Sequence, residues 1–116
     1  MAITLISNNV ETHGFLVNGN SANLSDCEEL VAATAGKSIY VERLAISFGA
    51  AITVTLGAGE TAGSVTTVLI GPLYGAANST IELTFTRPIK LAVNTALVAD
   101  GSGAGNVTIT CQGFIK

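Results

Sequence analysis

Strict alternation of apolar and polar residues recurs along this chain, and no helical period persists. Residues 51–57, 80–88 and 106–115 read AITVTLG, TIELTFTRP and NVTITCQGFI. Most of the polar residues between the apolar ones are threonine, which is β-branched and favours strands. The pattern predicts strands with one face in a core. The residues expected on that face are Ile52, Val54, Leu56, Ile81, Leu83, Phe85, Val107, Ile109 and Cys111.

The longest predicted strand changes phase part-way along its length. In SIYVERLAISFG, residues 38–49, Ile39 and Val41 share one alternation phase, and the apolar residues from Leu44 onward share the other. One extra residue, a β-bulge near Glu42, would bend the strand and restore a single inward face. We therefore expect one long, bent strand here, of the kind that sandwiches contain.

Turn signals separate roughly eight such segments at a spacing of about ten residues. The expected turns are NGNSAN, AGK, GAGETAGS, GPLYGAANS, RP and DGSGAGN. A length of 116 residues fits one domain, so we expect a single all-β domain, an antiparallel two-sheet sandwich resembling a jelly roll. For SDCEELVAATAG a helix capped by Ser25 is the alternative to a strand over residues 27–34.

No motif predicts a catalytic or cofactor site. The glycine-rich residues 100–106, DGSGAGN, lie between two predicted strands, so we expect a hairpin loop and not a phosphate site. His13 is the only histidine, which is too few for a metal site built from several histidines. Asp26, Glu28 and Glu29 are acidic, but their spacing matches no calcium loop. We expect no enzyme activity, no cofactor and no metal.

The two cysteines, Cys27 and Cys111, leave two possibilities open. They are either two reduced core residues, which fits a cytoplasmic chain, or one disulfide that ties an early strand to the last. Neither cysteine has a CxxC partner or a neighbouring histidine, so redox or metal chemistry is not expected.

Charge and hydropathy limit the partners. Charged residues make up 11% of the chain and the net charge is −3, whereas ordinary soluble proteins are roughly 25% charged. The five basic residues are scattered, so we expect no nucleic-acid binding. No apolar run reaches the roughly 18 residues of a membrane span, and no basic n-region marks a signal peptide. We expect a protein made in a cytoplasm, with a surface suited to packing against other proteins.

From Leu30 to the C-terminus the sequence resembles small virion proteins of tailed bacteriophages, the jelly-roll head decoration or cement proteins. The resemblance lies in LVAATAGKSIYVERLAISFGAAITVTLGAG, in GPLYG and in RPIKLAVNTALVADGSGAGNVTITCQGFIK. In that family VAATAGK opens a long strand, and a segment after GNV closes the sheet. Phe114 stands where the family pattern has tyrosine. The resemblance implies a jelly-roll domain, usually a homotrimer, without enzyme activity.

The resemblance implies one of two roles. The first is a structural virion protein on the capsid surface, made in the host cytoplasm, which binds the major capsid protein and stabilises the head lattice. The alternative is a receptor- or glycan-binding tip of a tail fibre or spike. Sugar sites typically use exposed aromatic rings, and this chain has no tryptophan and only two tyrosines. That scarcity favours the decoration role.

Two segments are candidates for contacts with other subunits. Ala45 and Ser47 are small residues on the outer side of the long strand, where they would let a neighbour approach closely, although this face is equally compatible with plain solvation. Residues 1–9, with apolar Ile3, Leu5 and Ile6, are either an extended N-terminal arm that docks on a neighbour or an ordinary first strand.

Overall fold

The computed structural model describes residues 3–10, 14–22 and 27–116, which contain nine strands and no helix. The strands are β1 (Thr4–Val10), β2 (Phe15–Ser21), β3 (Glu28–Val31), β4 (Ile39–Phe48), β5 (Ile52–Thr61), β6 (Ser64–Gly75), β7 (Ser79–Lys90), β8 (Leu97–Gly101) and β9 (Val107–Ile115). The predicted all-β class is confirmed. The alternative of a helix around Glu28–Val31 is wrong, because this stretch is β3.

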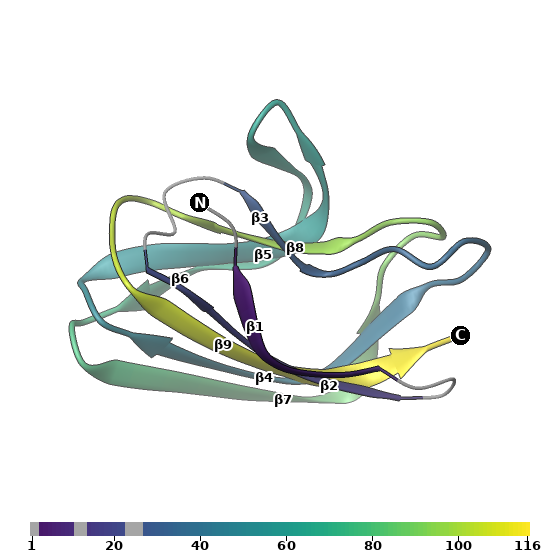
Figure 1. Cartoon of the computed structure of the whole chain (residues 1–116), viewed down its shortest axis with the longest axis horizontal. Helices are drawn as coiled ribbons and strands as arrows, with labels where there is room; N and C mark the ends of the chain where they lie inside the picture. Colours follow the sequence, from purple (N-terminus) through teal and green to yellow (C-terminus); the bar gives the residue numbers. More distant parts are fainter. Residues whose placement is uncertain (1–2, 11–13, 23–26) are drawn as a thin grey trace.

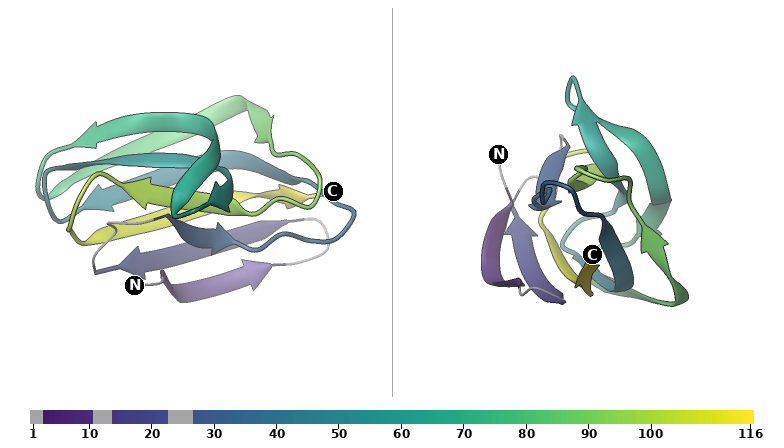
Figure 2. Two further views of the ribbon diagram at one scale, coloured as in Figure 1. Left: turned by 90° about the horizontal axis from the view of Figure 1, so that it is seen from above. Right: turned by 90° about the vertical axis from the view of Figure 1, so that its right-hand side faces the viewer.

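The strands form two antiparallel sheets that pack face to face (Figure 1). Sheet A has the order β1-β2-β9-β4-β7, and sheet B has the order β3-β8-β5-β6. Both sheets curve around a common interior, which is visible along the molecule in the right-hand view of Figure 2. The predicted β-sandwich is therefore confirmed.

The order of pairing is that of a jelly roll. β2 pairs with β9, β3 with β8, β4 with β7 and β5 with β6, and every pair is antiparallel. The chain from β2 to β9 is thus one long antiparallel double strand that rolls up on itself. The β4·β9 and β5·β8 pairings close the two sheets, and β1 extends sheet A beyond β2.

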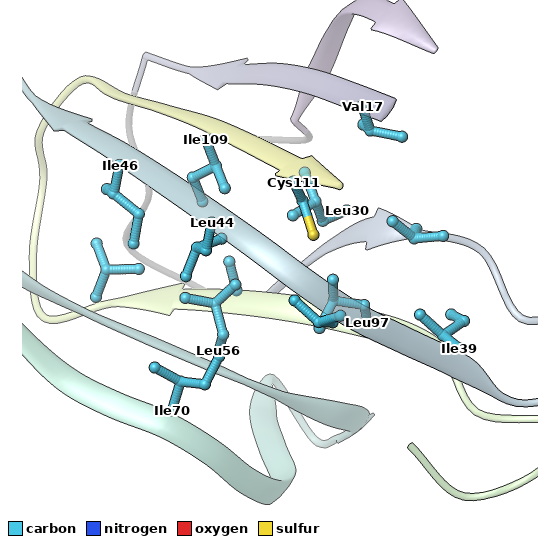
Figure 3. Packing of buried hydrophobic residues seen from close by; sticks show 14 of the residues in the cluster. Val17, Leu30, Ile39, Leu44, Ile46, Leu56, Ile70, Leu97, Ile109 and Cys111 are labelled. Atoms are coloured by element: carbon cyan, nitrogen blue, oxygen red, sulfur yellow. The ribbon is translucent and has the colours of Figure 1, made fainter. Parts of the chain in front are cut away.

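Apolar side chains from both sheets fill the space between them (Figure 3). Leu44 of β4 points toward Leu56 of β5, and both are fully buried. Of the predicted core residues, Val54, Leu56, Val107, Ile109 and Cys111 are buried, whereas Ile52, Ile81, Leu83 and Phe85 are partly buried and pack against the core. Alternation therefore predicted the inward face correctly.

The β-bulge predicted in β4 is present. The register of β4 shifts between Val41 and Arg43 against both of its neighbours, β7 and β9. As a result Ile39 and Val41 before the bulge and Leu44 after it are all buried. Arg43 points away from the core and is exposed.

Both prolines lie inside strands, contrary to the prediction that GPLYGAANS and RP are turns. Pro72 belongs to β6 and Pro88 to β7. Each of these strands is at the edge of its sheet, where the missing N–H of proline deprives no neighbouring strand of a hydrogen bond. The register also shifts next to each proline, as expected for a bulged edge.

Two predicted loops differ from expectation. GAGETAGS is mostly strand, and the β5–β6 turn consists of Ala62 and Gly63, whose φ angles are 51° and 80°. DGSGAGN does not form a hairpin loop, because its first two residues end β8 and residues 102–106 connect β8 of sheet B to β9 of sheet A. Sequence alone does not show whether the next strand remains in the same sheet.

The end of the β5–β6 hairpin stands over the outer side of sheet B (Figures 1 and 2). The Cys27 amide donates a hydrogen bond of 3.3 Å to the Gly63 carbonyl at its tip. Val98 of β8 lies between two core residues in sequence but outside the core cluster, and it is nevertheless only 3% exposed. The hairpin therefore covers part of the outer face of sheet B.

Candidate contact surface

The outer face of sheet A is a regular surface that the described residues leave uncovered. We call it the A face. It consists of the side chains that alternate with the core residues of four adjacent strands. These are Leu16, Asn18 and Asn20 of β2, Thr108, Thr110, Gln112 and Phe114 of β9, Tyr40, Arg43, Ala45 and Ser47 of β4, and Thr80, Glu82, Thr84 and Lys90 of β7.

Strand register arranges these side chains in rows across the sheet. The Ser47 row is Thr80, Ser47, Thr108 and Asn20, and the Ala45 row is Glu82, Ala45, Thr110 and Asn18. The Arg43 row is Thr84, Arg43, Gln112 and Leu16, and the last row is Lys90, Tyr40 and Phe114. Charged groups are confined to three positions, Arg43, Glu82 and Lys90, and the Ser47 row is uncharged.

Hydrogen bonds join the small polar side chains at one end of the A face. The Ser47 and Thr80 hydroxyls are 3.1 Å apart. Asn20 Nδ2 donates to Thr108 Oγ1 at 2.8 Å and to Asn106 Oδ1 at 2.7 Å. These cross-strand bonds hold short side chains against the sheet at this end of the surface.

Aromatic rings form the other end of the A face. Tyr40 and Phe114 stack with their ring centroids 4.5 Å apart and their planes 11° from parallel. Lys90 Nζ lies 5.9 Å from the Tyr40 centroid, within the range of a cation–π contact. The stack therefore fixes the rings side by side on adjacent strands.

Small residues on β4 leave two hollows in the A face. One, of about 210 Å³, lies beside Ala45 and is lined by Leu16, Arg43, Ala45, Thr110 and Gln112. The other, of about 330 Å³, lies at the Ser47 end and is lined by Ser47, Phe48, Gly49, Asn78, Ser79, Thr80, Asn106 and Thr108. Polar groups and one guanidinium line them together with apolar Leu16, Ala45 and Phe48, so the hollows suit side chains of another protein that combine apolar parts with hydrogen-bonding groups.

The structure separates the predicted contact residues into two groups. Ala45 and Ser47 lie two residues apart on β4, Ala45 in an inner row of the A face and Ser47 in the row at one end. Ile3 is partly buried and packs against the core of its own chain. Leu5 and Ile6 belong to β1, with a register shift between Leu5 and Ser7, and their side chains lie outside the described part. β2 and β9 stand between the two groups.

Pairing of β1 with β2 is the arrangement that the alternative of an ordinary first strand expected. It places the N-terminal segment at the free edge of sheet A within a single chain. The further prediction that this segment reaches a neighbour stays a prediction.

Both cysteines are free and buried. Burial raises the pKa of the Cys111 thiol to about 12. Burial, together with the nearby charges of Asp100, Glu60 and Glu28, raises the pKa of Cys27 to about 11. Both groups are therefore neutral thiols at pH 7. Of the two possibilities that the sequence left open, the structure contains two free thiols and not a disulfide.

The described residues contain no group of three or more His, Cys, Asp or Glu side chains that could hold a metal ion. His13 and Asp26 lie outside the described residues, so the hypotheses that involve them are not examined by the structure. The described part of the chain likewise has no helix of the length and apolarity needed to cross a membrane.

Sequence reasoning missed most of the A face. Arg43, Glu82 and Leu16 were not selected, although alternation placed Glu82 on an outer face. Their grouping depends on which strands pair and in which register, and adjacent strands of the A face are distant in sequence: β2 pairs with β9. The signal in the sequence that could have identified these residues is the alternation itself, because in each strand the residues between the apolar ones point outward.

No known protein family matches this sequence, and no curated protein is significantly similar to it.

Proposed function

We propose that this chain is a structural protein of a bacteriophage virion, a capsid decoration (cement) protein that binds the head lattice and stabilises it. The observation that carries the proposal is the A face, a broad sheet surface that the described chain leaves uncovered and on which only three side chains, Arg43, Glu82 and Lys90, are charged. The cores of protein interfaces are depleted of charged residues. A surface of this kind suits contact with another protein.

The jelly-roll topology supports the proposal only together with the sequence resemblance, because a fold by itself does not specify a function. The resemblance from Leu30 onward supplies the class of protein, and the topology is the one that this class implies. On this proposal the chain is made in the host cytoplasm and resides on the capsid surface. On the same proposal it uses no cofactor and binds neither nucleic acid nor membrane.

We propose a homotrimer as the assembled unit, with the major capsid protein as its partner. Only 11% of the residues are charged, so burying the threonine- and alanine-rich surface against copies of the chain costs little desolvation free energy. Each Å² of apolar area that is buried contributes about 25 cal/mol to the free energy of association. Native mass spectrometry should give three chains. A monomer at tens of micromolar in sedimentation equilibrium would count against a preformed trimer.

Strand β1 is the proposed contact with the lattice. Of the four edge strands, β6 and β7 contain proline, and β3 has four residues, two of them glutamate. β1 has seven residues, TLISNNV, without proline or charge. Long uncharged edges are the ones to which another strand can add. The free edge of β1 therefore suits pairing with a strand of the capsid protein or of a neighbouring subunit.

Immunoelectron microscopy of particles of the phage that encodes this chain tests the role. Antibody raised against the purified chain should label the heads at many positions. The heads of particles produced without the chain should break open at a lower temperature, or at an ionic strength that complete particles withstand. Purified chain added back should restore the resistance of the heads to heat and to low ionic strength. Unlabelled particles would contradict the proposal.

Deletion of residues 2–9 tests the β1 contact separately. The truncated chain should fold, as judged by circular dichroism, and should bind deficient particles with much lower affinity than the full chain. If it folds and binds equally well, the β1 contact is wrong. If the truncated chain does not fold, residues 2–9 belong to the sandwich core, and the proposed contact of β1 with the lattice is wrong in that case too.

One observation favours the alternative of a glycan-binding tip. Tyr74, at the edge of sheet B, is 78% exposed, and an exposed aromatic ring can stack on a sugar. Antibody label at tail tips, with host-cell binding that Tyr74→Ala abolishes, would support this role over decoration.

A further inference from the structure

The A face is self-complementary in shape. The Arg43 row carries long side chains, Arg43, Gln112 and Leu16, whereas the adjacent Ala45 row is low at Ala45 and Thr110. The hollow of about 210 Å³ lies between these two rows. A surface with a high row next to a low row fits a second copy of itself that is turned over and displaced by one row.

The A face is also self-complementary in charge. Arg43 on β4 and Glu82 on β7 lie on neighbouring strands, one row apart. Both side chains are exposed, and within the described residues neither is in an ion pair. The face thus presents one cation from the high row and one anion from the low row, each without a charged partner among the described residues of its own chain.

We propose that two copies of this chain pair through their A faces about a twofold axis that runs across the strands, between the Ala45 and Arg43 rows. This rotation exchanges the two rows. Arg43 of one copy then lies over Ala45 of the other, beside its Glu82, and Gln112 of each copy enters the space above Thr110 of the other. A twofold contact uses the same patch on both copies, so each ion pair occurs twice.

The size of the face predicts a reversible contact. Four strands at about 4.8 Å and four rows at about 6.8 Å give a face of about 500 Å² per copy, below the roughly 800 Å² per partner of a standard interface. Pairing should therefore depend on protein concentration. It is separate from the proposed threefold contact, which requires two different patches on each chain, so both can exist in one assembly.

Charge reversal tests the pairing. The unit that pairs is either the monomer or the trimer. Sedimentation equilibrium at low salt should show species that contain two such units and that dissociate on dilution. Arg43→Glu and Glu82→Arg should each raise the dissociation constant about tenfold or more, since close interfacial charge pairs couple strongly. The double variant Arg43→Glu/Glu82→Arg should recover most of the affinity, because the pair is re-formed with its signs exchanged.

Lys37→Glu and Glu29→Arg are the matched controls, since both residues are exposed and lie off the A face. They should leave the dissociation constant within about twofold of the parent. The proposal is overturned if no two-unit species forms, if the controls weaken it as much as the A-face variants, or if the double variant is no better than the single ones. Because Arg43 and Glu82 are exposed, circular dichroism should show all variants folded.

This inference deepens the proposed self-association but does not depend on the virion role. Loss of pairing in Arg43→Glu with intact labelling of phage heads would separate the two. Unlabelled particles together with charge-dependent pairing would overturn the decoration role and leave the twofold contact standing.

Discussion

Gly113 of β9 lies so close to Tyr40 of β4 that a Cβ atom on Gly113 would overlap the Tyr40 carbonyl oxygen. Gly113 pairs with Val41, directly before the β4 bulge. A bulge increases the local twist of its strand, and here the Tyr40 backbone turns toward β9. Phe15 closes the other side, since its Cζ would be 3.0 Å from the same Cβ atom.

Gly113→Ala should therefore destabilise the fold by about 1–3 kcal/mol, because the obstructing atom belongs to backbone that two neighbouring strands hold in place. Urea unfolding followed by circular dichroism measures the loss. Gly103→Ala is the control, since nothing lies within 4 Å of its Cβ position, and it should stay within about 0.5 kcal/mol. Equal stability of the two variants would show that the bulge does not crowd Gly113.

Leu44→Ala tests the phase of β4 after the bulge. Leu44 is 1% exposed, and truncating a buried leucine costs about 2–5 kcal/mol. Ser47→Ala, on the opposite face of the same strand, removes one exposed hydrogen bond to Thr80 and should cost about 0.5 kcal/mol or less. Chemical denaturation of both variants gives the comparison. A larger loss for Ser47→Ala would mean that the strand has the opposite phase.

The bulge was predictable because burial acts on both halves of β4. Ile39 and Leu44 are five residues apart, an odd spacing that cannot share one face of a regular strand. Both are apolar, so the sequence itself requires an inserted residue. Sandwich class and inward faces were predictable for the same reason, since burial leaves a period-two pattern in the sequence.

Whether a strand lies at the edge of its sheet leaves no period-two pattern in the sequence. Pro72 and Pro88 indicate turns when read locally, and only the sheet order shows that their strands lie at edges where proline is tolerated. The A face was unpredictable for a related reason. Arg43 and Glu82 become neighbours through the β4·β7 register, which is set by the shared core and not by the residues that face outward.

The buried thiols should make the protein less stable at alkaline pH. The pKa of Cys111 in the folded state is raised to about 12 and that of Cys27 to about 11, above the usual thiol value of 9.0. Between pH 9 and these values the unfolded chain releases protons that the folded chain retains. The free energy of unfolding therefore falls as pH rises through this window, and the thiol contribution is fully present below pH 9.

Denaturation midpoints measured from pH 8 to pH 11 should show this fall, and Cys111→Ala should make it shallower. The same variant should be less stable at pH 7, because it leaves a small cavity in the core. A thiol reagent at pH 8 should react with neither cysteine of the native protein and with both after unfolding. Rapid reaction of the native protein would contradict the burial of the two thiols.

The β5–β6 turn offers a stabilising substitution. Ala62 and Gly63 both have positive φ, 51° and 80°, the signature of a type I′ turn, for which Asn-Gly is the preferred pair. A left-handed conformation costs a non-glycine residue such as alanine roughly 1 kcal/mol, and asparagine tolerates it better. Ala62 is exposed, so its replacement loses no packing.

Ala62→Asn should raise the free energy of unfolding by about 0.5–1 kcal/mol and the melting temperature by a few degrees in scanning calorimetry. Asn94→Ala provides the opposite change, since Asn94 has a φ of 61° and its Oδ1 accepts a hydrogen bond from the Gly36 amide. It should lower the melting temperature. If Ala62→Asn is neutral or destabilising while Asn94→Ala lowers the melting temperature as expected, then strain at Ala62 does not limit stability. In that case the hydrogen bond between Gly63 and Cys27 holds the hairpin tip whichever residue occupies position 62.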